Sequence, residues 1–182
     1  STLDLTNAED TAAEIARIEN VFGEIDILVN GVGWDVFTPF LKSGPDFWTK
    51  IIDINLRSVF NITHPVLSSM TVRRSGKIVS LASDAARGGS SGESVYAACK
   101  AGIIAFSKTL AREHARHGIS VNVVCPGVTE TAMLETFMEK PVIKNNYVMP
   151  LHGLFPWGVW GSQRIFLEQF YFLPARTQIS SQ

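Results

Sequence analysis

The chain has 182 residues, 46% hydrophobic and 18% charged, which suits one globular domain with a core and excludes disordered and collagen-like chains. Its 16 basic and 17 acidic side chains give a net charge of −1, which argues against binding to nucleic acids or anionic membranes. No apolar run reaches about 18 residues, no signal peptide opens the chain, and its two cysteines lack metal-ligand spacing, so we expect a cytoplasmic protein.

Short apolar strands alternate with longer helices along most of the chain. The predicted strands cover residues 2–5, 25–30, 77–83 and 119–125, and the predicted helices cover residues 8–22, 46–70 and 94–117. The strand sequences are almost continuously hydrophobic, as is typical of parallel strands that are covered on both faces. The alternation therefore predicts a layered α/β fold, in which ligands bind at the carboxyl ends of the strands.

A tyrosine and a lysine stand four residues apart in the third predicted helix. Tyr96 and Lys100 therefore share one helix face. An ammonium group about 4 Å from the phenol, at an effective dielectric constant near 20, would contribute roughly 4 kcal/mol, or about 3 pK units. We expect this to bring the pKa of Tyr96 toward neutrality, where general acid–base catalysis works best. Ser83 is the last residue of a predicted strand and is placed to hydrogen-bond a substrate carbonyl. Taken alone, this spacing more often marks a half-buried tyrosine beside a solvated lysine.

Three further segments accompany this pair, and each places a turn or an amide near a predicted strand end. Asn30-Gly-Val-Gly33 follows the second strand, Asn55 lies within the second helix, and Cys125-Pro126-Gly127 ends the last strand. In order and spacing, residues 4 to about 133 resemble the short-chain dehydrogenase/reductase family. The resemblance implies a Rossmann-like, doubly wound parallel sheet with helices on both faces.

The resemblance also assigns site residues, position by position. It implies a catalytic tetrad of Asn55, Ser83, Tyr96 and Lys100. In this tetrad Tyr96 exchanges a proton with the substrate oxygen and Ser83 polarises that oxygen. Lys100 lowers the pKa of the tyrosine and holds the nicotinamide ribose, and Asn55 anchors a relay water. The implied cofactor is NAD, with NADP as an alternative, and its contacts are expected at Asp4, Leu5, Asn30, Gly31, Gly33, Tyr96, Lys100, Pro126, Gly127 and Thr131.

Within the family, residues 83–118 and Gly33-Trp34-Asp35 most resemble the subgroup that oxidises 2-hydroxycyclohexanecarboxyl-CoA. This implies a cyclic β-hydroxyacyl-CoA substrate, with Ser83, Trp34 and Arg87 as substrate contacts and Phe37 as a pocket wall. Ordinary packing or a solvated loop charge is the alternative for each of the last three. Reduction of 3-oxoacyl-carrier-protein thioesters is the nearest alternative activity. The resemblance also implies a homodimer or homotetramer built on the second and third helices.

The sequence departs from the family pattern at both ends. No GxxxGxG motif is present, so the family's first two strands and phosphate-binding turn have no counterpart here, and Gly31 and Val32 replace an Asn and an Ala. Residues 151–182 hold 7 of the 18 aromatic but only 3 of the 33 charged residues. We therefore divide the chain into a partial dinucleotide-binding domain, residues 1–150, and an atypical tail, residues 151–182, which we interpret as a frameshifted family ending.

Two other functions stay open beside the enzyme. In the first, the chain is an inactive enzyme fragment that keeps the tetrad but lacks the phosphate-binding turn. In the second, it is a non-enzymatic subunit whose sheet is completed by strands of a partner chain. No metal site is expected, because His114 and His117 have no third ligand with suitable spacing.

Overall fold

The computed structural model describes residues 3–127. Its α-helices are α1 (Ala8–Phe22), α2 (Pro45–Ile52), α3 (Ser58–Arg73), α4 (Ala85–Gly88) and α5 (Ser94–His114), and its strands are β1 (Ile27–Asn30), β2 (Gly76–Leu81) and β3 (Ile119–Val124). Thr131 and the predicted tail, residues 151–182, lie outside the described residues.

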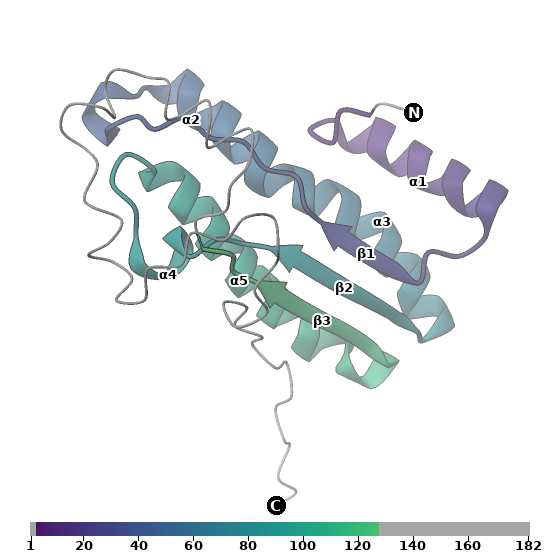
Figure 1. Ribbon diagram of the computed structural model, residues 1–182. Coiled ribbons are helices and arrows are strands. Elements are labelled where there is room, and N and C mark those ends of the chain that lie inside the picture. The colour runs from purple at the N-terminus through teal and green to yellow at the C-terminus, as the bar shows by residue number, and fades with distance from the viewer. Residues whose placement is uncertain (1–2, 128–182) are drawn as a thin grey trace, which may run out of the picture.

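The three strands form one parallel sheet in the order β1-β2-β3 (Figure 1). Asn30 pairs with Ser80, and Leu81 pairs with Val124, so the carboxyl ends of all three strands meet at one edge of the sheet. This arrangement confirms the predicted α/β class with a parallel, Rossmann-like sheet. Each strand runs close to its predicted bounds.

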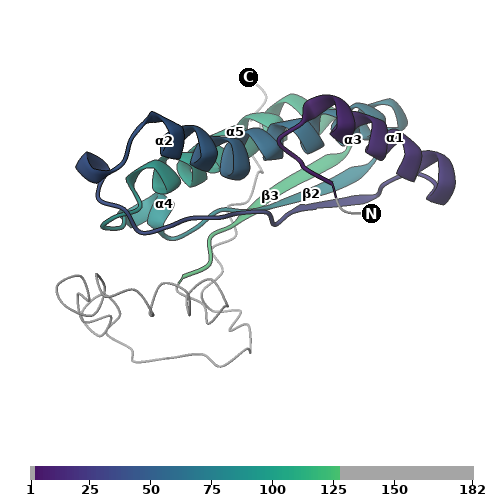
Figure 2. The ribbon, with the colours of Figure 1, turned by 90° about the horizontal axis from the view of Figure 1, so that it is seen from above.

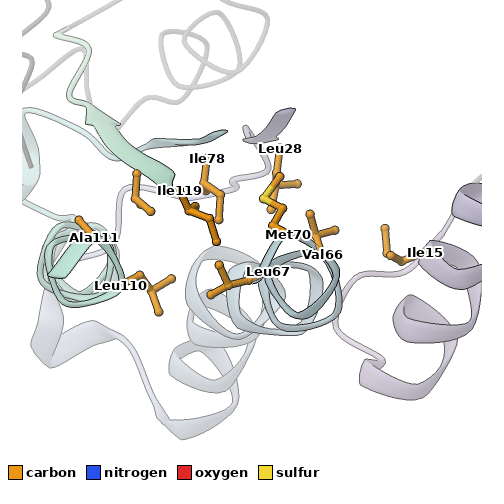
Figure 3. Packing of buried hydrophobic residues seen from close by; sticks show 10 residues of the cluster. Ile15, Leu28, Val66, Leu67, Met70, Ile78, Leu110, Ala111 and Ile119 are labelled. Carbon is orange, nitrogen blue, oxygen red and sulfur yellow. The ribbon is translucent and has the colours of Figure 1, made fainter. Parts of the chain in front are cut away.

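Helices α1, α3 and α5 lie on the same side of the sheet (Figure 2). The core between them is made of aliphatic side chains from both layers (Figure 3), namely Ile15, Leu28, Val66, Leu67, Met70, Ile78, Leu110, Ala111, Ile119 and Val121. A second cluster, nearer the carboxyl ends of the strands, contains Val59, Ala82, Ile103, Val123 and Cys125. These two clusters anchor the elements from which the site residues project.

The sequence predicts helices on both faces of the sheet. Within residues 3–127 the helices cover only one of these faces. On the other face, Ile27 and Val29 of β1 are 58% and 60% exposed. Their neighbours Leu28 and Asn30 point into the core side and are buried. The burial therefore alternates along β1, whereas the apolar sequence of this strand fits cover on both faces.

The predicted strand at residues 2–5 is wrong for the part that is described. Residues 3–5 make no sheet pairing, and the Asp4 carboxylate accepts hydrogen bonds from the backbone N–H and the hydroxyl of Thr6, at 2.9 and 2.8 Å. A strand requires a neighbour to receive its backbone groups, and none of the described strands lies beside this segment. The chain forms a turn there and enters α1, which Asn7 caps through the N–H groups of Glu9 and Asp10.

The second predicted helix is interrupted in the middle. Between α2 and α3 the backbone widens into a π-helical segment, Asp53–Arg57, which contains Asn55. Such π turns are rare and occur frequently at functional sites. No helix among residues 3–127 is long and apolar enough to cross a membrane.

Candidate active site

Expected site residues from all three strands lie at the carboxyl edge of the sheet. Asn30 ends β1, Ser83 follows β2, and Pro126 follows β3. The last two segments are joined directly, because the N–H of Asp84 donates to the carbonyl of Pro126 at 2.9 Å. Helix α5, which packs on the helical side of the sheet, places Tyr96 and Lys100 at the same edge.

The hydroxyl group of Ser83 lies near the phenol of Tyr96. The side chain of Ser83 hydrogen-bonds the phenol of Tyr96, which stabilises the tyrosinate and opposes the effect of burial. Ser83 Oγ also accepts a hydrogen bond from the N–H of Ala85 at 3.2 Å, which fixes its orientation at the start of α4. Two hydroxyls are thus held side by side at the end of β2.

Lys100 reaches the same place from one turn further along α5. Its side chain is buried, with 3% of the residue exposed, and Nζ donates to the carbonyl of Leu81 at 3.1 Å. Nζ lies 5.5 Å from the centroid of the Tyr96 ring. Burial disfavours the ammonium and lowers the pKa of Lys100 to about 8.

The expected lowering of the tyrosine pKa is wrong for this structure. Burial, together with the nearby carboxylates of Glu93 and Asp35, raises the pKa of Tyr96 to about 12, against the opposing hydrogen bond from Ser83. The lysine does not offset this effect, because its ammonium is directed at the Leu81 carbonyl and is itself disfavoured by burial. Tyr96 is therefore a protonated hydroxyl at neutral pH.

Asn55 is fully buried and holds the loop that follows β1. Its Nδ2 donates to the carbonyls of Trp34 and Ile51 at 2.7 and 2.9 Å, and its Oδ1 accepts from the N–H of Trp34 at 3.1 Å. These bonds engage the backbone of Trp34 on both sides. The side chain is thereby fixed between the π-helical segment and the loop.

Gly33 lies between two members of the tetrad. A Cβ atom at this position would stand 3.1 Å from Asn55 Oδ1 and 3.2 Å from Lys100 Nζ. At Gly31 the nearest atom to such a Cβ, Leu81 Cδ1, is at an ordinary 3.7 Å. The structure therefore brings Asn55, Lys100 and the turn after β1 into one compact group, and of these two glycines only Gly33 has such close neighbours.

The other expected cofactor contacts have structural partners of their own. Asn30 is buried, and its amide donates to Thr63 Oγ1 at 3.1 Å and Ser80 Oγ at 3.2 Å, joining β1 to α3 and β2. Asp4 is exposed and binds Thr6, and the Leu5 carbonyl accepts from Asn61 at 2.9 Å. Pro126 and Gly127 are half-buried beside the loop after β2.

The three expected substrate-side residues come from two segments, the loop after β1 and helix α4. The ring of Trp34 packs against Phe47 at 6.5 Å and carries Lys50 Nζ 4.0 Å above its centroid. Phe37 lies near Gly92, and Arg87 is exposed and forms an ion pair with Asp84 at 3.5 Å. Trp34 and Phe37 border the loop that Asn55 fixes, whereas Arg87 lies on α4.

Two acidic residues beside Tyr96 were missed in the sequence. Asp35 is buried at 3% exposure and hydrogen-bonds Glu93, which immediately precedes α5. The available signal was a carboxylate inside the apolar run Gly33-Trp-Asp-Val-Phe37, where a charge requires a partner. No three His, Cys, Asp or Glu side chains within residues 3–127 are grouped so that they could hold a metal ion.

The family follows from comparison of the whole sequence with known families. Residues 1–141 match the short chain dehydrogenase family. The chain belongs to this family. The match covers both the site residues at the carboxyl edge of the sheet and the elements that carry them.

Curated relatives of this short-chain dehydrogenase chain include an acetoacetyl-CoA reductase and a 3-oxoacyl-[acyl-carrier-protein] reductase. The acetoacetyl-CoA reductase of Shinella zoogloeoides is 40% identical over 147 residues, which is 81% of this chain and 60% of the relative. The 3-oxoacyl-[acyl-carrier-protein] reductase of Escherichia coli is 41% identical over 131 residues, which is 72% of this chain and 54% of the relative. The chain thus spans less than two thirds of the length of the curated relatives it matches.

Solved structures of the family show the same fold. A gluconate 5-dehydrogenase from Burkholderia cenocepacia, in complex with NADP and tartrate, has a TM-score of 0.73 and 30% identity, covering 77% of this chain and 55% of that protein. An NAD⁺-bound xylitol dehydrogenase has a TM-score of 0.71 and 28% identity, covering 74% and 52%. Both cofactors therefore occur among proteins with this fold.

Proposed function

We propose that the protein is an NAD(P)-dependent oxidoreductase that reduces the 3-oxo group of an acyl thioester to a secondary alcohol. The observation that carries this proposal is the hydrogen-bonded hydroxyl pair of Ser83 and Tyr96, held beside Lys100 at the carboxyl edge of the sheet. Two hydroxyls side by side can both hydrogen-bond one carbonyl oxygen, which is the group that gains charge during reduction.

The protonated state of Tyr96 suits the role of proton donor in carbonyl reduction. Because burial and the carboxylates keep its pKa high, Tyr96 carries a proton that it can donate to the carbonyl oxygen as the alcohol forms. Ser83 holds that oxygen and donates a second hydrogen bond. The names of the two curated relatives describe reductases, which supports the same direction.

The residues at the site fit a nicotinamide nucleotide. A bound nicotinamide supplies the hydride that reaches the carbonyl carbon. Lys100 has three N–H donors, of which the Leu81 carbonyl takes one, so others can bind ribose hydroxyls. The absence of a side chain at Gly33 leaves the backbone accessible close to Lys100 and Asn55. We assign the adenosine side to Asp4, Leu5, Asn30 and Gly31, and the nicotinamide side to Pro126, Gly127 and Thr131.

The identity of the acyl group is the finer part of the proposal. The relatives' names support a linear 3-oxoacyl thioester, as in the alternative predicted from the sequence. A cyclic β-hydroxyacyl-CoA remains a prediction from the sequence, and these relatives give it no support. Assembly as a homodimer or homotetramer likewise remains a prediction, and the partly exposed pair of Phe60 and Phe106 on α3 and α5, with centroids 4.7 Å apart, is where we would place the contact.

The experiment is a substrate panel with the purified protein and the variants Tyr96→Phe and Ser83→Ala. We expect oxidation of NADH or NADPH with acetoacetyl-CoA, loss of at least about a hundredfold in kcat for each variant, and little change in cofactor affinity. A panel that includes 2-oxocyclohexanecarboxyl-CoA separates linear from cyclic substrates. Undiminished turnover by Tyr96→Phe would contradict the role of this residue.

A further inference from the structure

Two acidic side chains meet beside Tyr96, from parts of the chain that are far apart in sequence. Asp35 lies in the loop after β1, and Glu93 lies directly before α5. The two segments are joined by their backbones as well, because the N–H of Thr38 donates to the carbonyl of Gly92 at 2.8 Å. Gly92 has a φ of +84°, which lets the chain turn at this point into the helix.

The Asp35 carboxyl has little else to bind. It is 3% exposed, it accepts from the N–H of Val36, and its Oδ2 is buried without a donor among the described residues. Asp35, Glu93 and Tyr96 line one recess, so the two acidic side chains and the phenol face the same small space.

The contact between the two carboxyls requires a proton. Ionised carboxylates offer only acceptors, so the hydrogen bond between Asp35 and Glu93 forms when one of them is protonated. Burial, together with the like charge of Glu93, raises the pKa of Asp35 to about 7. One carboxyl of the pair therefore remains protonated well above the ordinary range of an aspartate.

No neighbouring cation neutralises the pair within the described residues. On α5 the groups that face it are Tyr96, the buried thiol of Cys99 and Lys100, whose ammonium is directed at Leu81. On α2, Lys50 lies over the ring of Trp34. The loop after β2 contributes Ser83, which binds Tyr96. The charges of Glu93 and Asp35 both act on Tyr96 and make its ionisation harder.

We propose that Asp35 and Glu93 share one proton in a carboxyl pair that joins the loop after β1 to the amino end of α5, and that this pair is a positioning element that controls the acidity of Tyr96. The effect of this pair on catalysis rests on the proposed function, whereas the shared proton itself does not. When the pair loses its proton, the added negative charge holds Tyr96 more firmly in its protonated form, and the hydrogen bond between the two carboxyls is lost.

The proton can be detected by infrared spectroscopy without any turnover assay. In the wild-type protein, the difference between spectra at pH 6 and pH 9 should contain the C=O stretch of a buried carboxylic acid. We expect this band to disappear in Asp35→Asn and in Glu93→Gln. It should remain in the control Asp84→Asn, whose carboxylate pairs with Arg87 on the surface. Absence of the band from the wild-type protein, or its survival in both variants, would overturn the shared proton.

A second measurement follows the same proton through unfolding. Because the pKa of Asp35 is raised on folding, the folded state keeps a proton that the unfolded state has lost, so stability falls as the pH rises from about 4 to about 7. The ratio of the wild-type unfolding constant to that of Asp35→Asn should grow about tenfold per pH unit between pH 5 and 7. A constant ratio would contradict the pair. If Asp35→Asn does not fold, Glu93→Gln and the wild-type spectrum still decide the question.

The effect on Tyr96 has its own readout. The difference in tyrosinate absorbance between each protein and its Tyr96→Phe derivative isolates the ionisation of this residue. We expect Tyr96 to ionise at a lower pH in Asp35→Asn than in the wild-type protein, because one of the charges that oppose ionisation is removed. Unchanged ionisation in a variant that has lost the infrared band would overturn the control of Tyr96 and leave the proposed reductase activity untouched.

Discussion

Lys100 should destabilise the fold at neutral pH, and its replacement by methionine tests this. The folded pKa of about 8 lies about 2.5 units below the ordinary value of 10.5, which corresponds to about 3.4 kcal/mol of cost for carrying the charge in the folded state. Lys100→Met removes this cost, but it also removes the hydrogen bond to the Leu81 carbonyl, which offsets about 1–2 kcal/mol of the stabilisation. We therefore expect Lys100→Met to be about 1–2 kcal/mol more stable than the wild-type protein at pH 7, without bound cofactor.

The difference in unfolding free energy between Lys100→Met and the wild-type protein should also depend on pH, and this dependence is the more specific test. Above pH 8 the folded protein releases the Lys100 proton while the unfolded chain keeps it up to about pH 10.5, so the wild-type protein gains stability as the pH rises. Between pH 8 and 9.5 that gain is about 2 kcal/mol, at about 1.4 kcal/mol per unit. The methionine variant lacks it, and its advantage should vanish over this range.

Urea denaturation at pH 7, 8, 9 and 9.5 measures both proteins. Lys108→Met, which removes an exposed lysine from the same helix, controls for the loss of one positive charge from α5. The reasoning is refuted if the difference between the wild-type protein and Lys100→Met stays constant from pH 8 to 9.5, since the buried ammonium would then carry no cost.

Two glycine substitutions extend the account, each with a matched control. In Gly33→Ala the new Cβ displaces Asn55 Oδ1 and Lys100 Nζ, so kcat/KM for the acyl thioester should fall by about tenfold or more. The control Gly31→Ala, whose Cβ has its nearest contact at 3.7 Å, should change kcat/KM by less than about threefold. Equal effects of the two variants would contradict the packing of this turn. Gly118→Ala combines a φ of +72° with a Cβ 2.8 Å from the Arg74 carbonyl and should lower the free energy of unfolding by about 2 kcal/mol or more in urea denaturation. Gly89→Ala, with a similar φ of +75° and open space around it, should cost only about 1 kcal/mol, and an equal loss in both would show that the carbonyl contact is unimportant.

Much of the fold was predictable because the strands and helices carry strong local signals. The almost continuous apolar runs located β2 and β3 within one or two residues, and α1 was predicted with its observed bounds. Residues 2–5 show the limit of such patterns. A short apolar segment becomes a strand only beside a partner, and the described sheet offers none there. The π-helical segment at Asn55 was also invisible, because apolar periodicity does not distinguish it from an α-helix.

The site was predictable in its composition and less so in its electrostatics. Spacing correctly placed Tyr96 and Lys100 on one helix face near Ser83. The expected effect of the lysine on Tyr96 failed because burial penalises the charges of both groups, and a spacing argument contains no burial. Asp35 and Glu93 are 58 residues apart in the numbering and meet only after the loops have packed, so no local pattern joined them.

We propose above all that the hydroxyl pair of Ser83 and Tyr96 serves the reduction of the 3-oxo group of an acyl thioester by a nicotinamide. The most direct measurement is the mass of the product formed from acetoacetyl-CoA and NADH or NADPH carrying deuterium at the transferable C4 position. We expect 3-hydroxybutyryl-CoA with one deuterium at C3, and loss of this product in Tyr96→Phe. Product without deuterium, or labelled product formed equally well by Tyr96→Phe, would contradict it.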